Sequence, residues 1–209
     1  MDMIGKRCDR RTAMRAVLVF VCLAAAAAYP GRANAERMRW EIEQGVDVPS
    51  YAAVEPTATA LNIDMVVLAC EQADKSRVLQ LQLYLSDDGR LRPIGVSPAE
   101  LSDDPRASIS IDAVDYPVSL MFSGDHVLLA DGLEGAFPRL SDRLIAAMQA
   151  GRTMILQFEL LAPRPGRPAG FDSQTTVDLQ SAGAGAAIAA MRQCVGAPER
   201  SRPWRSSSG

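Results

Sequence analysis

The chain has 209 residues, of which 48% are hydrophobic and 22% are charged, and its formal net charge is −3. Removal of the first 35 residues as a signal peptide would leave 174 residues with 16 basic and 23 acidic side chains, a net charge of −7. This acidic balance excludes general nucleic-acid binding, which needs a basic surface. The remaining length suits one domain with a sizeable core.

Residues 1–35 have the three parts of a secretory signal peptide. The apolar part, residues 16–28, is too short to anchor stably in a bilayer. Ala33-Asn34-Ala35 offers the small residues that signal peptidase needs, so we expect cleavage after Ala35. The alternatives are a retained membrane helix and export by the twin-arginine route through Arg10-Arg11. Since no later stretch is apolar enough for a membrane helix, we expect a periplasmic or secreted protein with no membrane span after signal removal.

The first half of the remaining chain predicts strands. Residues 38–43 alternate and predict a first strand with Trp40 inward, and residues 44–58 predict a long connection. Residues 77–85 alternate leucine with polar side chains, which is typical of a half-buried strand. Residues 61–70 predict its neighbour, and the part from residue 65 on is apolar on both faces. We therefore expect this second strand to be covered on each side.

The middle of the chain predicts shorter elements. We expect a short strand or edge at residues 91–96, a polar loop at 97–105, and strands at 107–112, 116–122 and 127–130. Pro117 cannot donate a ladder hydrogen bond, so the strand that contains it is predicted to be an edge or to be bulged.

Towards the C-terminus the spacing of the apolar residues changes from the alternation of strands to the spacing of a helix. A helix is predicted from the N-cap Ser141 to a C′ glycine, Gly151. Strands follow at residues 153–161 and 171–180, separated by a loop at 163–170, and a helix is expected at 184–194. In the two strands we expect an inward face of alternate residues: Met154, Leu156, Phe158, Leu160, Thr175, Val177 and Leu179. Residues 198–209 have no core pattern and are predicted to be a disordered tail.

Two of the four cysteines, Cys70 and Cys194, remain after signal removal. Two cysteines in an oxidising compartment usually pair, so we predict a disulfide between them. A reactive thiol is the alternative, but there is no Cys-x-x-Cys pair and no basic neighbour to lower a thiol pKa.

Together these elements predict a single β-rich domain over residues 36–197. The fold class is mainly β: an antiparallel β-sandwich with one short helix before the last two strands and a C-terminal helix disulfide-linked to a central strand.

The stretch from residue 140 to residue 191 also matches a family pattern. Leu140, Leu144, Met148 and Gly151 follow a Leu-x-x-x-Leu-x-x-x-Leu-x-x-Gly run, and a strand, a loop, a strand and a small-residue helix come after it. This arrangement resembles the C-terminal half of the invasion-associated locus B family and similar periplasmic β-sandwich proteins. The resemblance implies a β-sandwich in the periplasm and no enzyme activity. Ser181-Ala182-Gly183 stands where the family has glycine and phenylalanine.

The sequence is poor in catalytic and cofactor-binding motifs. His126 is the only histidine, and a triad would have to use Asp125 or Asp131 without a Gly-x-Ser-x-Gly turn. One histidine and two paired cysteines leave no transition-metal site, and the turn at Asp87-Asp88-Gly89 lacks the later ligands of a calcium loop. No phosphate loop or dinucleotide fingerprint is present, so we expect no cofactor.

Paired carboxylates are the remaining route to catalysis. The candidates all lie in predicted turns, where aspartate is favoured for local hydrogen bonding; they are Asp103, Asp104, Asp112, Asp115, Asp125 and Asp131. We therefore expect a non-catalytic exported protein that binds another protein or an envelope component. The alternatives are a small-ligand carrier, which needs a cavity or an apolar cleft, and an envelope hydrolase using acidic residues. The tail, with Arg200, Arg202, Trp204 and Arg205, is either solvated or touches an anionic surface.

Overall fold

The structure is a computed structural model, and it describes residues 39–74, 76–87, 89–124, 126–166 and 170–196. All of these belong to one contact unit, residues 37–209. The predicted signal peptide and the predicted tail lie outside the described residues.

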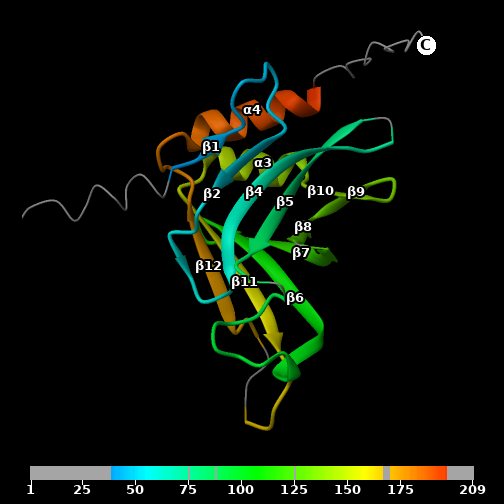
Figure 1. Ribbon diagram of the computed structural model, residues 1–209, viewed down its shortest axis with the longest axis vertical. Helices are drawn as coiled ribbons and strands as arrows, with labels where there is room; N and C mark the ends of the chain where they lie inside the picture. Colours follow the sequence, from blue (N-terminus) through cyan, green and yellow to red (C-terminus); the bar gives the residue numbers. More distant parts are fainter. Residues whose placement is uncertain (1–38, 75, 88, 125, 167–169, 197–209) are drawn as a thin grey trace, which may run out of the picture. The chain divides into compact units, whose positions relative to one another are not determined.

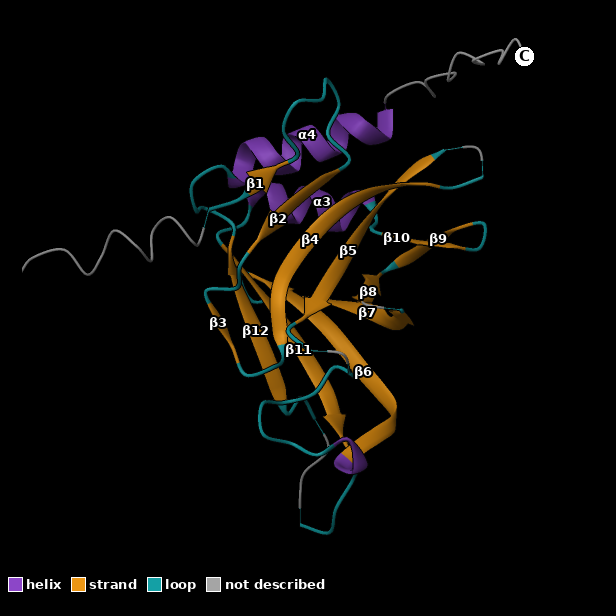
Figure 2. Ribbon diagram, in the orientation of Figure 1, coloured by secondary structure: helices purple, strands orange, loops and turns teal. Residues whose placement is uncertain are grey.

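The described residues form β-strands and two α-helices, shown by type in Figure 2. In chain order the strands are β1 (Glu41–Ile42), β2 (Tyr51–Val54), β3 (Ala58–Thr59), β4 (Ile63–Gln72), β5 (Arg77–Leu85), β6 (Leu101–Ile111), β7 (Val114–Ser123), β8 (His126–Ala130), β9 (Gly132–Glu134), β10 (Phe137–Arg139), β11 (Thr153–Leu161) and β12 (Ser173–Asp178). The helices are α3 (Asp142–Ala150) and α4 (Ala184–Gly196), and a 3-10 turn, η1 (Pro98–Glu100), precedes β6.

One strand, β7, joins the two halves of a ten-stranded antiparallel sheet with the order β1-β2-β4-β5-β8-β7-β6-β11-β12-β3. Residues 114–118 of β7 pair with β6, and residues 119–123 pair with β8. Figure 1 shows β6, β11 and β12 on one side of this junction and β2, β4 and β5 on the other. Pro117 lies in the first part, where β6 is the only ladder neighbour among the described residues, as its missing N–H predicts.

Inward side chains of both halves meet in one core, so the sheet closes over itself as the predicted sandwich. The alternation of β11 was predicted correctly: Met154, Leu156 and Phe158 are 0% exposed and Leu160 is 2% exposed. The same holds in and just after β12, where the inward residues Thr175, Val177 and Leu179 are buried. Each alternate residue reaches the core because successive side chains leave opposite faces of a strand.

Helix α3 begins at the predicted cap. The Ser141 hydroxyl accepts a hydrogen bond from the Leu144 N–H at 3.2 Å, which satisfies one free donor of the first turn. Gly151 ends the helix as predicted, as its C-cap with a φ of −77°, which is not the left-handed conformation common for glycine at this place. Glycine fits there because a Cβ atom would lie 2.5 Å from the Ile111 Cγ2 atom. Close packing against β6, and not backbone conformation, explains this glycine.

Helix α4 packs against the face of β4 that carries Cys70. Its buried side chains include Ala187, Ile188 and Met191, each 0% exposed. The predicted disulfide joins Cys70 of β4 to Cys194 of α4, with their Cα atoms 6.4 Å apart. The C-terminal helix is therefore both packed and covalently fastened onto a central strand.

Three predictions need correction, and one hairpin was missed. The expected connection at 44–58 contains β2, which pairs with β4, and the expected loop at 97–105 contains the first half of β6. Both stretches are weakly patterned, and they form strands because a neighbouring strand needs hydrogen-bond partners. Residues 91–96 form no strand beyond one bridge between Leu61 and Pro93. The β9–β10 hairpin at 132–139 was not predicted.

The expected first strand at residues 38–43 is shortened to β1, although Trp40 is buried as predicted, at 2% exposure. In the part of the chain that the structure describes, neither helix is long and apolar enough to cross a bilayer.

Candidate functional site

The outer face of β2, β4 and β5 forms an open groove of about 570 Å³ on the side of the sheet that faces away from the core. We call it the outer groove. Its apolar lining includes Tyr51, Ala53, Met65, Val67, Ala69, Tyr84 and Leu85, and its polar lining includes Asp64, Glu71 and Gln82. The expectation that β4 is covered on both faces is therefore half correct. Helix α4 covers the inner face, whereas the outer face of Met65–Ala69 lines this groove.

Strand register builds the floor of the outer groove. Ala53 pairs with Val67, and Val67 pairs with Gln82, so their side chains form one row across three strands. Ala53, Val67 and Ala69 form an apolar cluster separate from the main core. The alanine and valine side chains are short and rise little above the sheet, whereas the longer side chains of Met65 and Tyr84 pack against them. Small floor residues between larger neighbours produce the hollow.

A ladder of polar side chains borders this floor. The Gln82 amide donates to the Glu71 Oε1 atom at 3.2 Å and to the Gln80 Oε1 atom at 3.3 Å. The Tyr84 hydroxyl donates to the Gln82 Oε1 atom at 3.3 Å, and the Gln80 amide donates to the Pro138 carbonyl at 2.9 Å. Gln80 and Gln82 are 6% and 4% exposed. Because these amides are satisfied, the ladder orders the groove without leaving a buried polar atom unpaired.

The charges of the outer groove lie at its margins. Asp64 and Glu71 are exposed and line it from opposite ends of β4. A third carboxylate, Glu43, lies close to the groove residue Ser50 and accepts hydrogen bonds from its N–H and its hydroxyl, both at 2.7 Å. The Ser50 N–H first, and its hydroxyl second, lower the pKa of Glu43 below its usual range. An apolar floor with acidic margins is suited to an apolar segment that has basic neighbours.

A second hollow lies elsewhere, between the start of β5, the β9–β10 hairpin and the two helices. This arginine cleft has a volume of about 410 Å³ and contains Arg77, Arg139 and Arg192. The guanidinium of Arg77 lies 3.3 Å from the Cys194 sulfur, and that of Arg192 lies 2.6 Å from the Gln149 side-chain oxygen. The cleft also holds Glu134 and Asp142, so its charges nearly balance.

His126 lies beside the outer groove, stacked on Tyr84 with the ring centroids 5.4 Å apart. Asp131, one of the two aspartates that a triad with His126 would have to use, follows the other end of β8, about 16 Å away at strand spacing. Its carboxylate accepts a hydrogen bond from the Ser141 N–H at 2.6 Å and so supports the N-cap of α3. Asp125 lies outside the described residues. The structure therefore does not bring His126 and Asp131 together.

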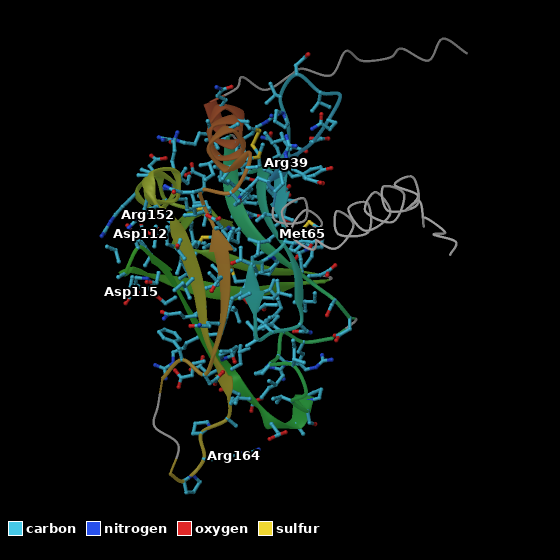
Figure 3. The ribbon with its side chains drawn as sticks, turned by 90° about the vertical axis from the view of Figure 1, so that its left-hand side faces the viewer. Arg39, Met65, Asp112, Asp115, Arg152 and Arg164 are labelled. Atoms are coloured by element: carbon cyan, nitrogen blue, oxygen red, sulfur yellow. A yellow bond between two sulfur atoms is a disulfide. The ribbon has the colours of Figure 1, made fainter. Side chains whose placement is uncertain are left out.

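The other predicted carboxylates are separated from both hollows. Asp112 accepts hydrogen bonds from the backbone N–H groups of Arg152 and Thr153, at 3.1–3.2 Å, and fastens the β6–β7 turn to the start of β11. Figure 3 shows Asp112, Asp115 and Arg152 at one side of the view and Met65 of the outer groove at the other. Asp103 and Asp104 lie on β6. Within the described residues, no group of three or more histidine, cysteine, aspartate or glutamate side chains is placed to hold a metal ion.

Sequence reasoning missed Gln80, Gln82 and Glu71 as members of one site. The available signal was that polar residues alternate along residues 77–85 while the neighbouring strand is apolar on both faces. Such a polar row in the middle of a sheet indicates an ordered network. Which acceptors complete it depends on strand register, and register is a tertiary property.

No protein-family model matches the chain, and neither a curated protein nor a solved structure shows significant similarity to it. The similarity to the invasion-associated locus B family stays a prediction from the sequence pattern.

Proposed function

We propose that this chain is an exported, non-catalytic protein that binds another protein of the envelope through the outer groove. The observation that carries the proposal is an open, apolar-floored groove of about 570 Å³ with acidic margins. The disulfide between Cys70 and Cys194 supports export, because such bonds persist in oxidising compartments. The N-terminal signal pattern supports it independently.

The groove also defines the chemistry of the partner. Ala53, Val67 and Ala69 offer apolar contact to a narrow side-chain row, and the satisfied ladder of Gln80 and Gln82 keeps the floor rigid. A rigid, preformed surface lowers the ordering cost of binding. Exposed Asp64 and Glu71 favour basic residues on either side of the bound segment. The expected partner is therefore a protein with an apolar segment flanked by lysine or arginine.

Site-specific photo-crosslinking in the native envelope tests this function. A crosslinking residue at position 65, in the groove, is compared with one at position 133, where Leu133 is 63% exposed in β9 and lies outside the groove lining. We expect a discrete adduct with one protein from position 65 only, identified by mass spectrometry.

The charge-reversing variant Glu71→Lys supplies the second arm. We expect it to reduce the position-65 adduct at least five-fold, because it repels basic flanks, whereas Asp103→Lys, at an exposed acid on β6, leaves it unchanged. The same adducts from positions 65 and 133, or equal yields with both charge reversals, would contradict the proposal.

Carriage of a small ligand is the second candidate function. The volume of the outer groove falls within the roughly 300–1,000 Å³ of small-molecule sites. Native mass spectrometry of the chain purified from its own envelope would show a bound mass, and Ala69→Trp would remove it by filling the floor. If the purified chain has only its own mass, with no bound ligand, and the protein adduct described above forms, the protein-binding function is favoured.

A further inference from the structure

The second half of β7 is an open sheet edge. Residues 119–123 pair with β8, while β6 pairs only with residues 114–118. Figure 2 shows β6 turning towards the 3-10 turn while β7 and β8 run out to one side. Among the described residues, residues 119–123 thus have a ladder neighbour on one side only. Such an edge presents unpaired backbone N–H and C=O groups to any strand that reaches it.

Several other edges of the same sheet are protected. The outermost strands, β1 and β3, have two residues each. Residues 101–106 of β6, which β7 leaves uncovered, contain Asp103, Asp104 and Pro105. Short length, charge and proline are the features by which proteins prevent edge-to-edge pairing.

The β7 edge has none of these protecting features. Its five residues, Ser-Leu-Met-Phe-Ser, include no charge and no proline. Leu120 and Met121 are half-buried, and Phe122 is 51% exposed. Within the described residues, this stretch combines apolar side chains with backbone groups that have no ladder partner on the side away from β8, so leaving it exposed to solvent is unfavourable.

The residue order of this edge is symmetric and so suits pairing with a second copy of itself. Read in either direction, it runs serine, bulky apolar residue, methionine, bulky apolar residue, serine. In an antiparallel pair of two such strands centred on Met121, each Leu120 lies opposite Phe122 of the second copy, and each Ser119 lies opposite Ser123 of the second copy. Facing aromatic and aliphatic side chains stabilise antiparallel pairs. A two-fold interface requires this self-complementarity.

We propose that two copies of the chain associate through their β7 edges, as an antiparallel strand pair centred on Met121. The surface is separate from the outer groove, so the inference goes beyond the proposed function. A five-residue edge is small beside the roughly 800 Å² per partner of a standard interface, so the dimer is concentration-dependent. The net negative charge of each copy opposes association only weakly, because salt screens charges more than about 8 Å apart at physiological ionic strength.

Sedimentation equilibrium of the purified chain without residues 1–35, across a range of concentrations, tests the proposal. Phe122→Lys places a charge on the open edge, and Val114→Lys is the matched control. Val114 belongs to the same strand and is 49% exposed, but it pairs with β6. We expect a monomer–dimer equilibrium whose dissociation constant rises at least ten-fold with Phe122→Lys and stays unchanged with Val114→Lys. Circular dichroism verifies that both variants are folded.

Crosslinking tests the register. In a pair centred on Met121, the Cα atoms of the two copies of that residue lie about 4.5–5.5 Å apart, within disulfide range. We expect Met121→Cys to give a covalent dimer on oxidation and Val114→Cys to give none. A wild-type monomer at all concentrations, equal effects of the two lysine variants, or no covalent dimer from Met121→Cys would overturn the proposal.

Discussion

Loss of the disulfide between Cys70 and Cys194 is the perturbation whose size follows most directly from the fold. The two cysteines are 124 residues apart in sequence, so their bond closes most of the described chain into one loop. Chain-entropy estimates assign about 4–5 kcal/mol to a loop of this length, with engineered bonds often giving less. The double variant Cys70→Ala/Cys194→Ala should therefore lose up to about 4–5 kcal/mol of unfolding free energy.

The packing of α4 determines whether the chain still folds without the disulfide. Ala187, Ile188 and Met191 of α4 are fully buried, so the helix keeps an apolar face that holds it against the sheet without the covalent bond. Typical domains have about 5–15 kcal/mol of stability. The variant should accordingly fold, but with a much lower midpoint in urea.

Urea titration at 25 °C, followed by far-UV circular dichroism, measures this change. Wild-type chain treated with a reductant is the matched control, since it loses the bond without losing the sulfur atoms. Both samples should show the same large drop in midpoint. If the unfolding free energy of both samples fell by less than about 1 kcal/mol, the reasoning would be refuted, because the bond would not restrict the unfolded chain as the loop model requires.

Three smaller predictions follow from local geometry. Gly151→Ala should lower stability by about 1–3 kcal/mol in thermal unfolding, since its Cβ would lie 2.5 Å from Ile111; an unchanged midpoint would show that β6 can shift. Ser141→Ala should lose about 1 kcal/mol with the α3 cap, and Ser141→Thr, whose hydroxyl can still donate to the Asp131 carboxylate, should restore most of it. Hydrogen bonds from Ser50 lower the pKa of Glu43, so their stabilisation is complete above the unfolded-state pKa of about 4.3 and is lost as pH falls through the lower folded-state pKa. The stability difference between wild type and Glu43→Gln should shrink over that range, and a difference that stays constant down to pH 3 would contradict the assignment.

The candidate site was harder to predict than the fold. The sequence offered only His126 and a set of aspartates as candidates for chemistry, and the structure separates His126 from Asp131 and uses Asp112 to fasten a turn. The outer groove depends on Ala53 standing beside Val67, which are 14 positions apart in sequence and adjacent only in the ladder. No local pattern contains that information, because strand order and register decide which side chains share a face.

The sequence by itself determined the elements that bury one face, because such a face requires apolar residues at a regular spacing. The alternation of β11, the spacing of α3 and α4, and the partnership of Cys70 with Cys194 could all be read before any coordinates, because each is a local pattern or a matter of counting. Tertiary structure alone decided that residues 101–106 are a strand, that β7 serves both halves of the sheet, and that one half of β7 is left open. These outcomes depend on which neighbour satisfies each backbone N–H and C=O group, and a strand's neighbours are set by the whole chain.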